Sequence, residues 1–208
     1  MNEELTRGEN TRLEIVQAAH KLFIGHGYHG TSMRQIAQTA GIALGSIYNH
    51  FSSKEDVFVA VLKAHHPYHE ILSAAESAHG DTLEAFLGGV AAQMVAALAR
   101  RPEFLNLMLI EIVEFNSRHV PTLFAEVFPE FATFSKKFTS MPGRLRPIPV
   151  LIVMRAFVGL FFSYYITEAL IGEQIPAQMK ENALEHFVDI FLYGVLDRGH
   201  SGSAASEE

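Results

Sequence analysis

Apolar residues recur every three to four positions along most of the chain, and this spacing constrains the fold more than any other feature. In the segment from Thr11 to Gly27, one helical face carries Ile15, Ala19, Leu22 and Phe23. Similar segments are separated by prolines at positions 102, 121, 142, 147, 149 and 176, where a helix tolerates a missing amide. No stretch of useful length alternates polar and apolar residues, so the pattern predicts an all-α fold.

The predicted helices form an N-terminal and a C-terminal group. In the first group, one helix begins at Ser32, a very short one follows Gly41, and another begins at Ser52. Ser32 with Gln35, and Ser52 with Glu55, have the spacing of a capping box, in which each side chain satisfies a free helix amide. In the second group we expect longer helices near residues 82–100, 103–118, 121–139, 147–171 and 177–196. The total is about nine helices.

Composition limits the functions that the chain can have. Its 208 residues are enough for one large or two small domains, and the lack of cysteine excludes disulfides and thiolate catalysis. The net charge of −7 argues against a generally basic coat for nucleic acid. Charge is uneven, however: residues 1–54 hold five Lys or Arg and four Asp or Glu, whereas the rest holds eleven and nineteen. The polar N-terminus has no signal-peptide pattern.

One apolar run, Val150 to Gly172, is long enough to suggest a membrane span. Arg155 and Glu168 interrupt it and leave twelve uncharged residues between them. A span needs roughly 20 predominantly apolar residues and tolerates charge poorly near its centre. We therefore interpret the run as a helix that is buried on most sides, and we expect no membrane association.

The stretch GIALGSIYNHFSSKEDVF, residues 41–58, has the pattern of a helix-turn-helix. Gly41 permits a sharp turn after the preceding helix. On the short helix that follows, Ile47 and Phe51 point one way, while the small and polar residues Gly45, Ser46 and Asn49 point the other. Small outward residues let a helix approach bases in a major groove about 12 Å wide. Spacing alone also fits a plain helical corner with a solvated polar face.

Residues 12–62 resemble the DNA-binding domain of the TetR family of bacterial transcriptional repressors. The resemblance rests on two motifs, A..LF...GY.GTS...IA..AG and G.IY.HF..KE.....V, which occur in the family's order and spacing. Beyond residue 65 the resemblance is general: an all-helical domain that ends in two long helices. The family implies a homodimer that binds operator DNA through its N-terminal helices. It also implies a C-terminal domain that binds an inducer and then lowers the affinity for DNA.

Position by position, the resemblance implies two sets of DNA contacts. The first set would hold phosphates and comprises Thr31, Ser32, Tyr48, His50 and Lys54. The second set would face base edges or nearby backbone and comprises Arg34, Leu44, Gly45, Ser46 and Asn49.

Two positions depart from the family pattern. Ala43 stands where members often have a Ser or Thr helix cap, and the loss of such a cap costs about 0.5–2 kcal/mol. We therefore expect the short helix to order fully only on DNA. Leu44, often polar in the family, could contact a thymine methyl group or turn inward.

Other residue clusters carry little chemistry. His65, His66 and His69 could suggest a metal site, but Pro67 breaks the helical register between them and no further ligands complete a set. We interpret them as linker surface. The chain lacks a glycine-rich phosphate loop, a G-x-S-x-G motif and an H-E-x-x-H motif. We expect no enzyme activity, no metal and no cofactor.

Aromatic residues concentrate in the C-terminal group of helices. Such rings usually form a core, but many rings around a few polar groups also describe a cavity for an apolar ligand. The candidate ligand-binding residues are Phe104, Met108, Glu111, Phe115, Arg155 and Phe161. Glu111 lies among apolar neighbours and needs a partner. That partner is either Arg155 or Arg118 in a structural ion pair, or the ligand itself.

Together these patterns predict an N-terminal helix-turn-helix DNA-binding domain (1–53), a helical ligand-binding and dimerisation domain (54–200) and a disordered tail (201–208). The expected protein is a cytoplasmic, homodimeric repressor that an apolar or amphipathic small molecule releases from double-stranded operator DNA. The alternative is a helical enzyme or carrier with an aromatic cavity for a hydrophobic molecule. The expected dimer contacts come from the last two long helices and include Val158, Phe162, Tyr165, Phe187, Phe191 and Val195.

Overall fold

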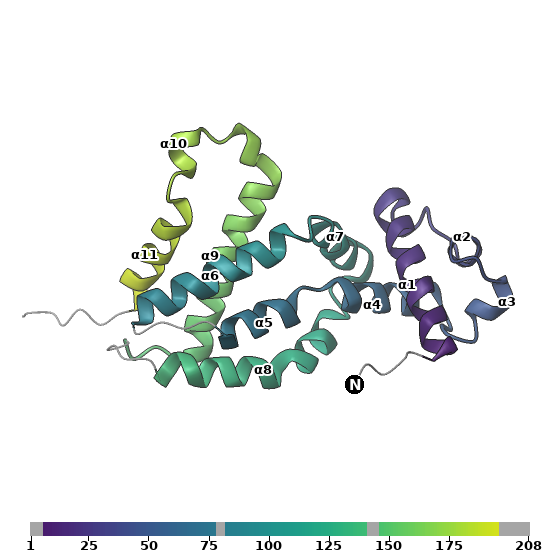
Figure 1. The fold of residues 1–208 in the computed structure, drawn as a ribbon, viewed down its shortest axis with the longest axis horizontal. Helices are drawn as coiled ribbons and strands as arrows, with labels where there is room; N and C mark the ends of the chain where they lie inside the picture. The colour runs from purple at the N-terminus through teal and green to yellow at the C-terminus, as the bar shows by residue number, and fades with distance from the viewer. Residues whose placement is uncertain (1–5, 78–81, 141–145, 196–208) are drawn as a thin grey trace, which may run out of the picture. The chain divides into compact units, whose positions relative to one another are not determined.

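The computed structural model describes residues 6–77, 82–140 and 146–195, and every regular element in these ranges is helical (Figure 1). The predicted all-α fold is therefore confirmed. The predicted tail at 201–208 lies outside the described residues. The chain divides into two compact units: Met1–Tyr68 with Arg101–Phe128 form the first, and His69–Arg100 with Pro129–Glu208 form the second.

The first unit contains the helix-turn-helix segment and its neighbours. Its helices are α1 (Arg7–His26), α2 (Met33–Thr39), α3 (Leu44–Ile47), α4 (Lys54–His65), α7 (Phe104–Phe115) and the first part of α8 (Val120–Ser140). The second unit contains most of α5 (Tyr68–Ser77), α6 (Leu83–Ala99), the rest of α8, α9 (Val150–Ile171), the 3-10 helix η1 (Gly172–Gln174), α10 (Ala177–Lys180) and α11 (Ala183–Val195). The domain boundary that we predict at residue 53 would separate α4 from the DNA-binding domain, whereas α4 packs against α1 and α7 within the first unit.

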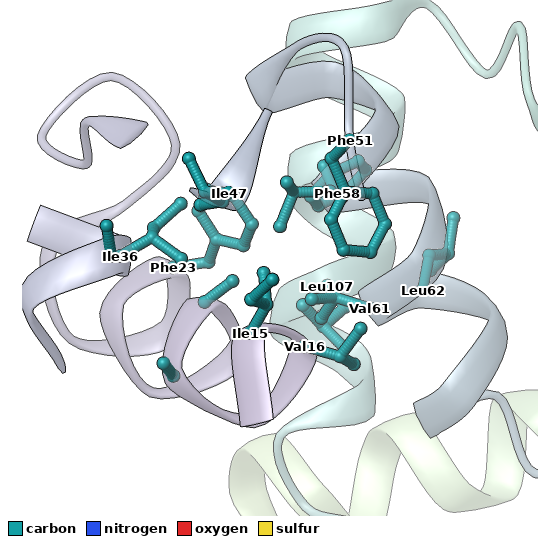
Figure 2. Close-up of a cluster of buried hydrophobic side chains, with 14 of the residues drawn as sticks. Ile15, Val16, Phe23, Ile36, Ile47, Phe51, Phe58, Val61, Leu62 and Leu107 are labelled. Carbon is teal, nitrogen blue, oxygen red and sulfur yellow. The ribbon is translucent and has the colours of Figure 1, made fainter. Parts of the chain in front are cut away.

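A continuous apolar core holds the first unit together. Phe23 of α1, Phe58 of α4 and Phe115 of α7 meet in it, with ring centroids 5.6 Å apart for Phe23 and Phe58 and 4.9 Å apart for Phe58 and Phe115. Figure 2 shows Ile36 of α2 and Ile47 of α3 turned toward the same cluster. Full burial of each such side chain contributes about 1.5–3 kcal/mol, so the core fixes all five helices to one another.

The second unit has its own core, formed where α6, α9 and α11 pack pairwise. Phe86 of α6, Phe161 of α9 and Phe191 of α11 are buried. Phe157 contacts both Phe161 and Phe191, with ring centroids 4.6 Å and 5.3 Å away. Tyr165 and Phe191, two of the expected dimer contacts, therefore belong to the internal core of this unit.

The outer faces of α9 and α11 remain strongly apolar. Large side chains exposed on them include Leu151, Ile152, Val158, Leu170, Ile190 and Tyr193. By length and composition, Val150–Gln174 is apolar enough to cross a membrane, with a mean hydropathy of 1.8. The helix nevertheless packs against α6 and α11, as a core helix does. Only 28% of its most apolar window is buried, less than the sequence led us to expect.

Several predicted element boundaries are wrong in detail. The cap of α4 is Ser53, which accepts from the Asp56 amide at 3.0 Å, so the expected Ser52–Glu55 box does not form. The helix expected at 177–196 is broken into α10 and α11, because Asn182 adopts the left-handed conformation with φ 54°. The described ranges hold eleven α-helices and one 3-10 helix, which roughly matches the expected total of about nine.

Candidate DNA-binding interface

The turn between α2 and α3 has the predicted construction. Ser32 caps α2 in a reciprocal box with Gln35, which confirms that prediction. Gly41 has φ 70°, a conformation that a residue with a Cβ rarely adopts, and the following amide of Ile42 donates to Ala37 O at 3.0 Å. Ala43 leaves α3 without a side-chain cap. The turn directs α3 across the end of α2, as in a helix-turn-helix.

α3 presents two different faces. Ile47 is fully buried and Phe51 nearly so, which anchors the helix to the core (Figure 2). Gly45 and Leu44 of α3 are exposed, as is Asn49, which follows the helix. Leu44 is 42% exposed, so of its two possible placements the outward one is found. Ser46 is half-buried at the edge.

Lys54 is half-buried, and its side chain folds back onto the α1–α2 turn. Its Nζ donates to Tyr28 O at 2.7 Å and to Thr31 O at 2.8 Å, and it lies 4.1 Å from the centre of the Tyr28 ring. Burial lowers the pKa of this ammonium group. Two of its three hydrogens thus hold the α1–α2 turn against α4, and the phosphate contact that the family implies would have only one hydrogen left.

Thr31 and Ser32 also have internal partners. Thr31 is 2% exposed, and its hydroxyl donates to Gly27 O at 2.9 Å, so this side chain stabilises the turn and is not available as a phosphate donor. The turn is tight at Gly30, where an added Cβ would lie 2.2 Å from His26 O. Ser32 is exposed, but its hydroxyl donates to Gln35 Oε1 at 2.7 Å.

Arg12 is a cation near α3 that the sequence motifs did not indicate. Its Nη1 donates to His50 O at 3.0 Å, and its guanidinium lies 4.1 Å from the centre of the Phe51 ring. Tyr48, directly after α3, is 52% exposed, and Arg34 is exposed on α2. A cationic side chain placed by two contacts beside the exposed face of α3 suits a DNA phosphate.

A chain of polar contacts connects the start of α4 to α7 and α8. Glu111 of α7 is fully buried and accepts from the His119 amide and bonds its Nδ1, both at 2.8 Å. The Nε2 of His119 lies 3.1 Å from Glu55 of α4, and Arg118 pairs with the same carboxylate at 2.5 Å. The structural partner of Glu111 is therefore His119, and the expected pairing with Arg155 or Arg118 is wrong.

A second polar contact joins the α1–α2 turn to α7. His29 Nε2 lies 2.5 Å from Glu114 Oε2. Close by, the rings of Tyr28 and Phe115 pack edge-on, with their centroids 4.8 Å apart. Polar and apolar contacts thus attach α7 to the turn that precedes α2.

The candidate ligand-binding residues do not gather into one cavity lining. Phe104, Phe115 and Phe161 are 5%, 5% and 0% exposed and belong to packed cores, the first two in one unit and the third in the other. Arg155 is exposed on α9. Met108 lines a small apolar cavity of about 110 Å³ together with Leu123 and Val127.

The histidine cluster of the linker gives no metal site among the described residues. His65 stacks on His20 of α1 with ring centroids 3.7 Å apart. His66 meets the Phe104 ring edge-on at 4.8 Å. The His69 side chain lies outside the described residues.

Comparison with known sequences agrees with this geometry. Residues 15–61 match the family described as bacterial regulatory proteins, tetR family. The HTH-type transcriptional regulator YvkB of Bacillus subtilis is 22% identical over 89% of this chain and 97% of its own length. The repressor AcnR of Corynebacterium diphtheriae is 40% identical, but over only 25% of this chain and 27% of its own length. TtgR of Pseudomonas putida is 33% identical over 35% of each chain.

Solved structures extend the similarity to the whole fold. A TetR-family regulator of Mesorhizobium loti superposes with a TM-score of 0.71 at 26% identity, over 93% of this chain and all of that one. NalD of Pseudomonas aeruginosa, at 20% identity, shares the fold with a TM-score of 0.65 over 93% of this chain and all of NalD. α1–α3 thus form the helix-turn-helix domain of a DNA-binding regulator. Residues 15–61 belong to the TetR family of bacterial regulatory proteins, and the chain as a whole is similar to regulators of that family.

Proposed function

We propose that this regulator is a repressor that binds its operator as a homodimer in the cytoplasm and is released by a small molecule. The exposed surface of α3 and of the residues directly after it carries the proposal, because it combines a small residue, Gly45, with a side chain that can read bases, Asn49. In this arrangement α3 enters the major groove. Tyr48, His50, Arg34 and the newly identified Arg12 contact phosphates or adjacent bases.

The exposed apolar faces of α9 and α11 support the homodimer. A soluble monomer rarely leaves such a contiguous apolar surface uncovered. Two copies packed through these helices would form a four-helix bundle and cover Ile152, Val158 and Ile190. A two-fold dimer would also present two α3 helices to half-sites about 34 Å apart, one turn of DNA.

α4 is the element through which we propose that release occurs. Its first turn supports the α1–α2 turn through Lys54 and contacts the α7–α8 corner through Glu55. A ligand that displaced the α7–α8 corner would therefore disturb both contacts. To act as inducer, it must bind the DNA-free conformation more tightly, because equal affinity for both states shifts nothing.

An apolar or amphipathic inducer agrees with what two structural neighbours are reported to do. FadR of Bacillus subtilis was solved in complex with stearoyl-CoA, and NalD is the secondary repressor of a multidrug efflux pump. These neighbours are less than 25% identical to this chain. They indicate a class of inducer and leave its identity open.

The test is fluorescence anisotropy with a labelled fragment from the upstream region of the protein's own gene. We expect binding that unlabelled copies of the fragment compete away and that random DNA competes away about a thousandfold less well. Affinity should also fall steeply with salt, because phosphate contacts release counterions. Equal competition by random DNA, both for this fragment and for sequences selected from a random library, would contradict the proposal.

A further inference from the structure

The second unit contains a large cleft that none of the candidate ligand-binding residues line. It has a volume of about 640 Å³ and lies between α6, α9 and the α10–α11 segment. This volume is within the range of about 300–1,000 Å³ that small-molecule sites occupy. An added Cβ on Gly88, in the α6 wall, would meet no atom within 4 Å, so the space beside this helix is empty.

The cleft differs chemically from a neighbouring groove in the same unit. That groove, about 300 Å³ between α9 and α11, is lined by Ile152, Leu160, Ile190 and other residues without charge. Such a lining suits the apolar face of a second subunit. The cleft instead combines an apolar floor, which includes Leu184 and Val188, with charged residues. A charged lining of this kind fits a water-soluble ligand better than a subunit core.

The charges around the cleft have one dominant sign. Glu84 of α6 and Glu185 and Asp189 of α11 contribute three carboxylates, and Lys180 of α10 contributes one cation. Within the part of the chain that the structure describes, none of the four side chains makes a hydrogen bond or an ion pair. Glu185 and Asp189 stand one helical turn apart, a spacing at which like charges repel. A positively charged ligand would relieve that repulsion.

Tyr164 adds an aromatic surface to this lining. Its ring packs edge-on against Phe187 at 5.1 Å, which holds it in place. Burial raises the pKa of its hydroxyl, so the group stays protonated and neutral near pH 7. An aromatic face beside carboxylates is the combination that recognises organic cations, because the ring attracts the cation and the apolar part of the ligand packs on it.

We propose that the cleft formed by α6, α9, α10 and α11 binds an amphipathic organic cation, with Glu185 and Asp189 as its charge contacts and Tyr164 as its aromatic contact. That this ligand is also the inducer rests on the proposed function as a ligand-released repressor. The binding site itself does not depend on that function.

The test compares two probes of the same shape and opposite charge. Tetraphenylphosphonium and tetraphenylborate are titrated by calorimetry into the full-length protein. We expect saturable binding of the phosphonium at one site per subunit, and binding of the borate at least about tenfold weaker. No saturable binding of the phosphonium, or equal binding of both probes, would overturn the proposal.

Three variants locate the site. Glu185→Gln with Asp189→Asn should weaken phosphonium binding by about 5- to 25-fold, since each partly exposed ion pair contributes modestly. Gly88→Leu should block the cleft without harm to folding, because the space beside Gly88 is empty and leucine favours helix. Glu173→Gln, exposed on η1 and outside the lining, is the matched control and should bind as wild type. Unchanged binding in the first two variants would refute the assignment.

A separate measurement distinguishes failure of this inference from failure of the proposed function. Operator binding is measured by anisotropy with and without tetraphenylphosphonium. If the operator is bound specifically but the phosphonium does not bind the protein, the regulator function stands and the cleft assignment is wrong. If the phosphonium binds the cleft but leaves operator affinity unchanged, the site stands and its role as inducer site is refuted.

Discussion

The two units of the molecule differ in how their helices distribute buried polar groups and exposed apolar side chains. In the first unit the buried carboxylate of Glu111 has its partner and the rings of three helices meet in one core. In the second unit α9 and α11 bury one side of each helix and leave large apolar residues such as Ile152 and Ile190 exposed. The first unit also exposes large apolar side chains, among them Ile112 and Val113 of α7. The contrast is that the second unit exposes them along both of its long C-terminal helices, the faces that a second copy would cover in the proposed dimer.

The largest expected effect tests whether a second copy covers the exposed apolar faces of α9 and α11. Ile190→Glu places a carboxylate on an α11 side chain that is 62% exposed here and that the proposed dimer would cover. Burial of an unpaired charge at an interface costs about 2–5 kcal/mol, so self-association should weaken by about 30- to 5,000-fold. Analytical ultracentrifugation at micromolar concentration should find mostly monomer.

The control for this variant is Gln93→Glu, which adds the same charge at an exposed position of α6. It should remain dimeric. A wild-type protein that sediments as a monomer would mean that the exposed faces of α9 and α11 need another explanation.

A second prediction tests how Lys54 contributes to the first unit. Lys54→Met keeps the aliphatic stem but removes both charge-assisted bonds to Tyr28 O and Thr31 O. We expect a loss of about 2–4 kcal/mol in the free energy of unfolding, measured in urea. Lys63→Met is the matched control: its partner Glu126 lies at the surface, and such pairs contribute under about 1 kcal/mol. If Lys54→Met instead lowers DNA affinity at unchanged stability, Lys54 is primarily a phosphate contact.

Within the first unit, the sequence predicts local features and misses one that depends on the path of the chain. The Ser32–Gln35 cap, the Gly41 turn and the inward side of α3 depend on residues within a few positions of one another, and the sequence predicts all three. The partner of Glu111 does not follow from helical spacing. Asn116 and Ser117 both adopt positive φ after α7 and turn the chain so that His119 returns to Glu111.

Contacts between distant helices were the least predictable. The bond from Arg12 to His50 O spans 38 positions, and the bonds from Lys54 to the α1–α2 turn span 26 and 23. No local pattern marks such pairs, because tertiary packing creates them. The family motif includes Lys54, but a motif does not say whether a lysine points outward to a phosphate or inward to a carbonyl. In the second unit the cleft went unpredicted because it depends on how α6 and α11 meet.

A third prediction separates base contacts from phosphate contacts on the first unit. Asn49→Ala removes an exposed side chain of the α3 segment and should reduce discrimination between operator and random DNA by about 1–3 kcal/mol. Arg12→Ala should weaken binding to both DNAs alike. Anisotropy titrations with the two DNAs measure both quantities. Equal losses on operator and random DNA for Asn49→Ala would remove this residue from the base-reading set.

The smallest expected effect concerns the contact between α1 and α4, where His20 and His65 stack. Burial, with the nearby His20 and Arg101, lowers the pKa of His65 to about 4 from 6.5, although Glu103 opposes the shift. Burial also lowers the pKa of His20, whose Nε2 lies 3.2 Å from Glu103. Folding therefore disfavours the protonated form of both histidines, and both bind protons more readily once the protein unfolds.

This difference makes the stability of the first unit depend on pH in one direction. Above about pH 6.5 His65 is neutral in both states and its contribution is complete. As the pH falls from 6.5 towards 4, the unfolded state takes up the proton first, so stability decreases by about 1–2 kcal/mol after allowance for partial exposure. Urea unfolding of wild type and His65→Asn at several pH values isolates the effect, because the carboxylates that titrate in the same range are common to both. The stability difference between them should shrink or reverse as the pH falls.

His26→Asn, at an exposed position of α1, should follow the wild-type pH dependence. A constant difference between wild type and His65→Asn from pH 7 to pH 4 would show that the stacked pair does not resist protonation.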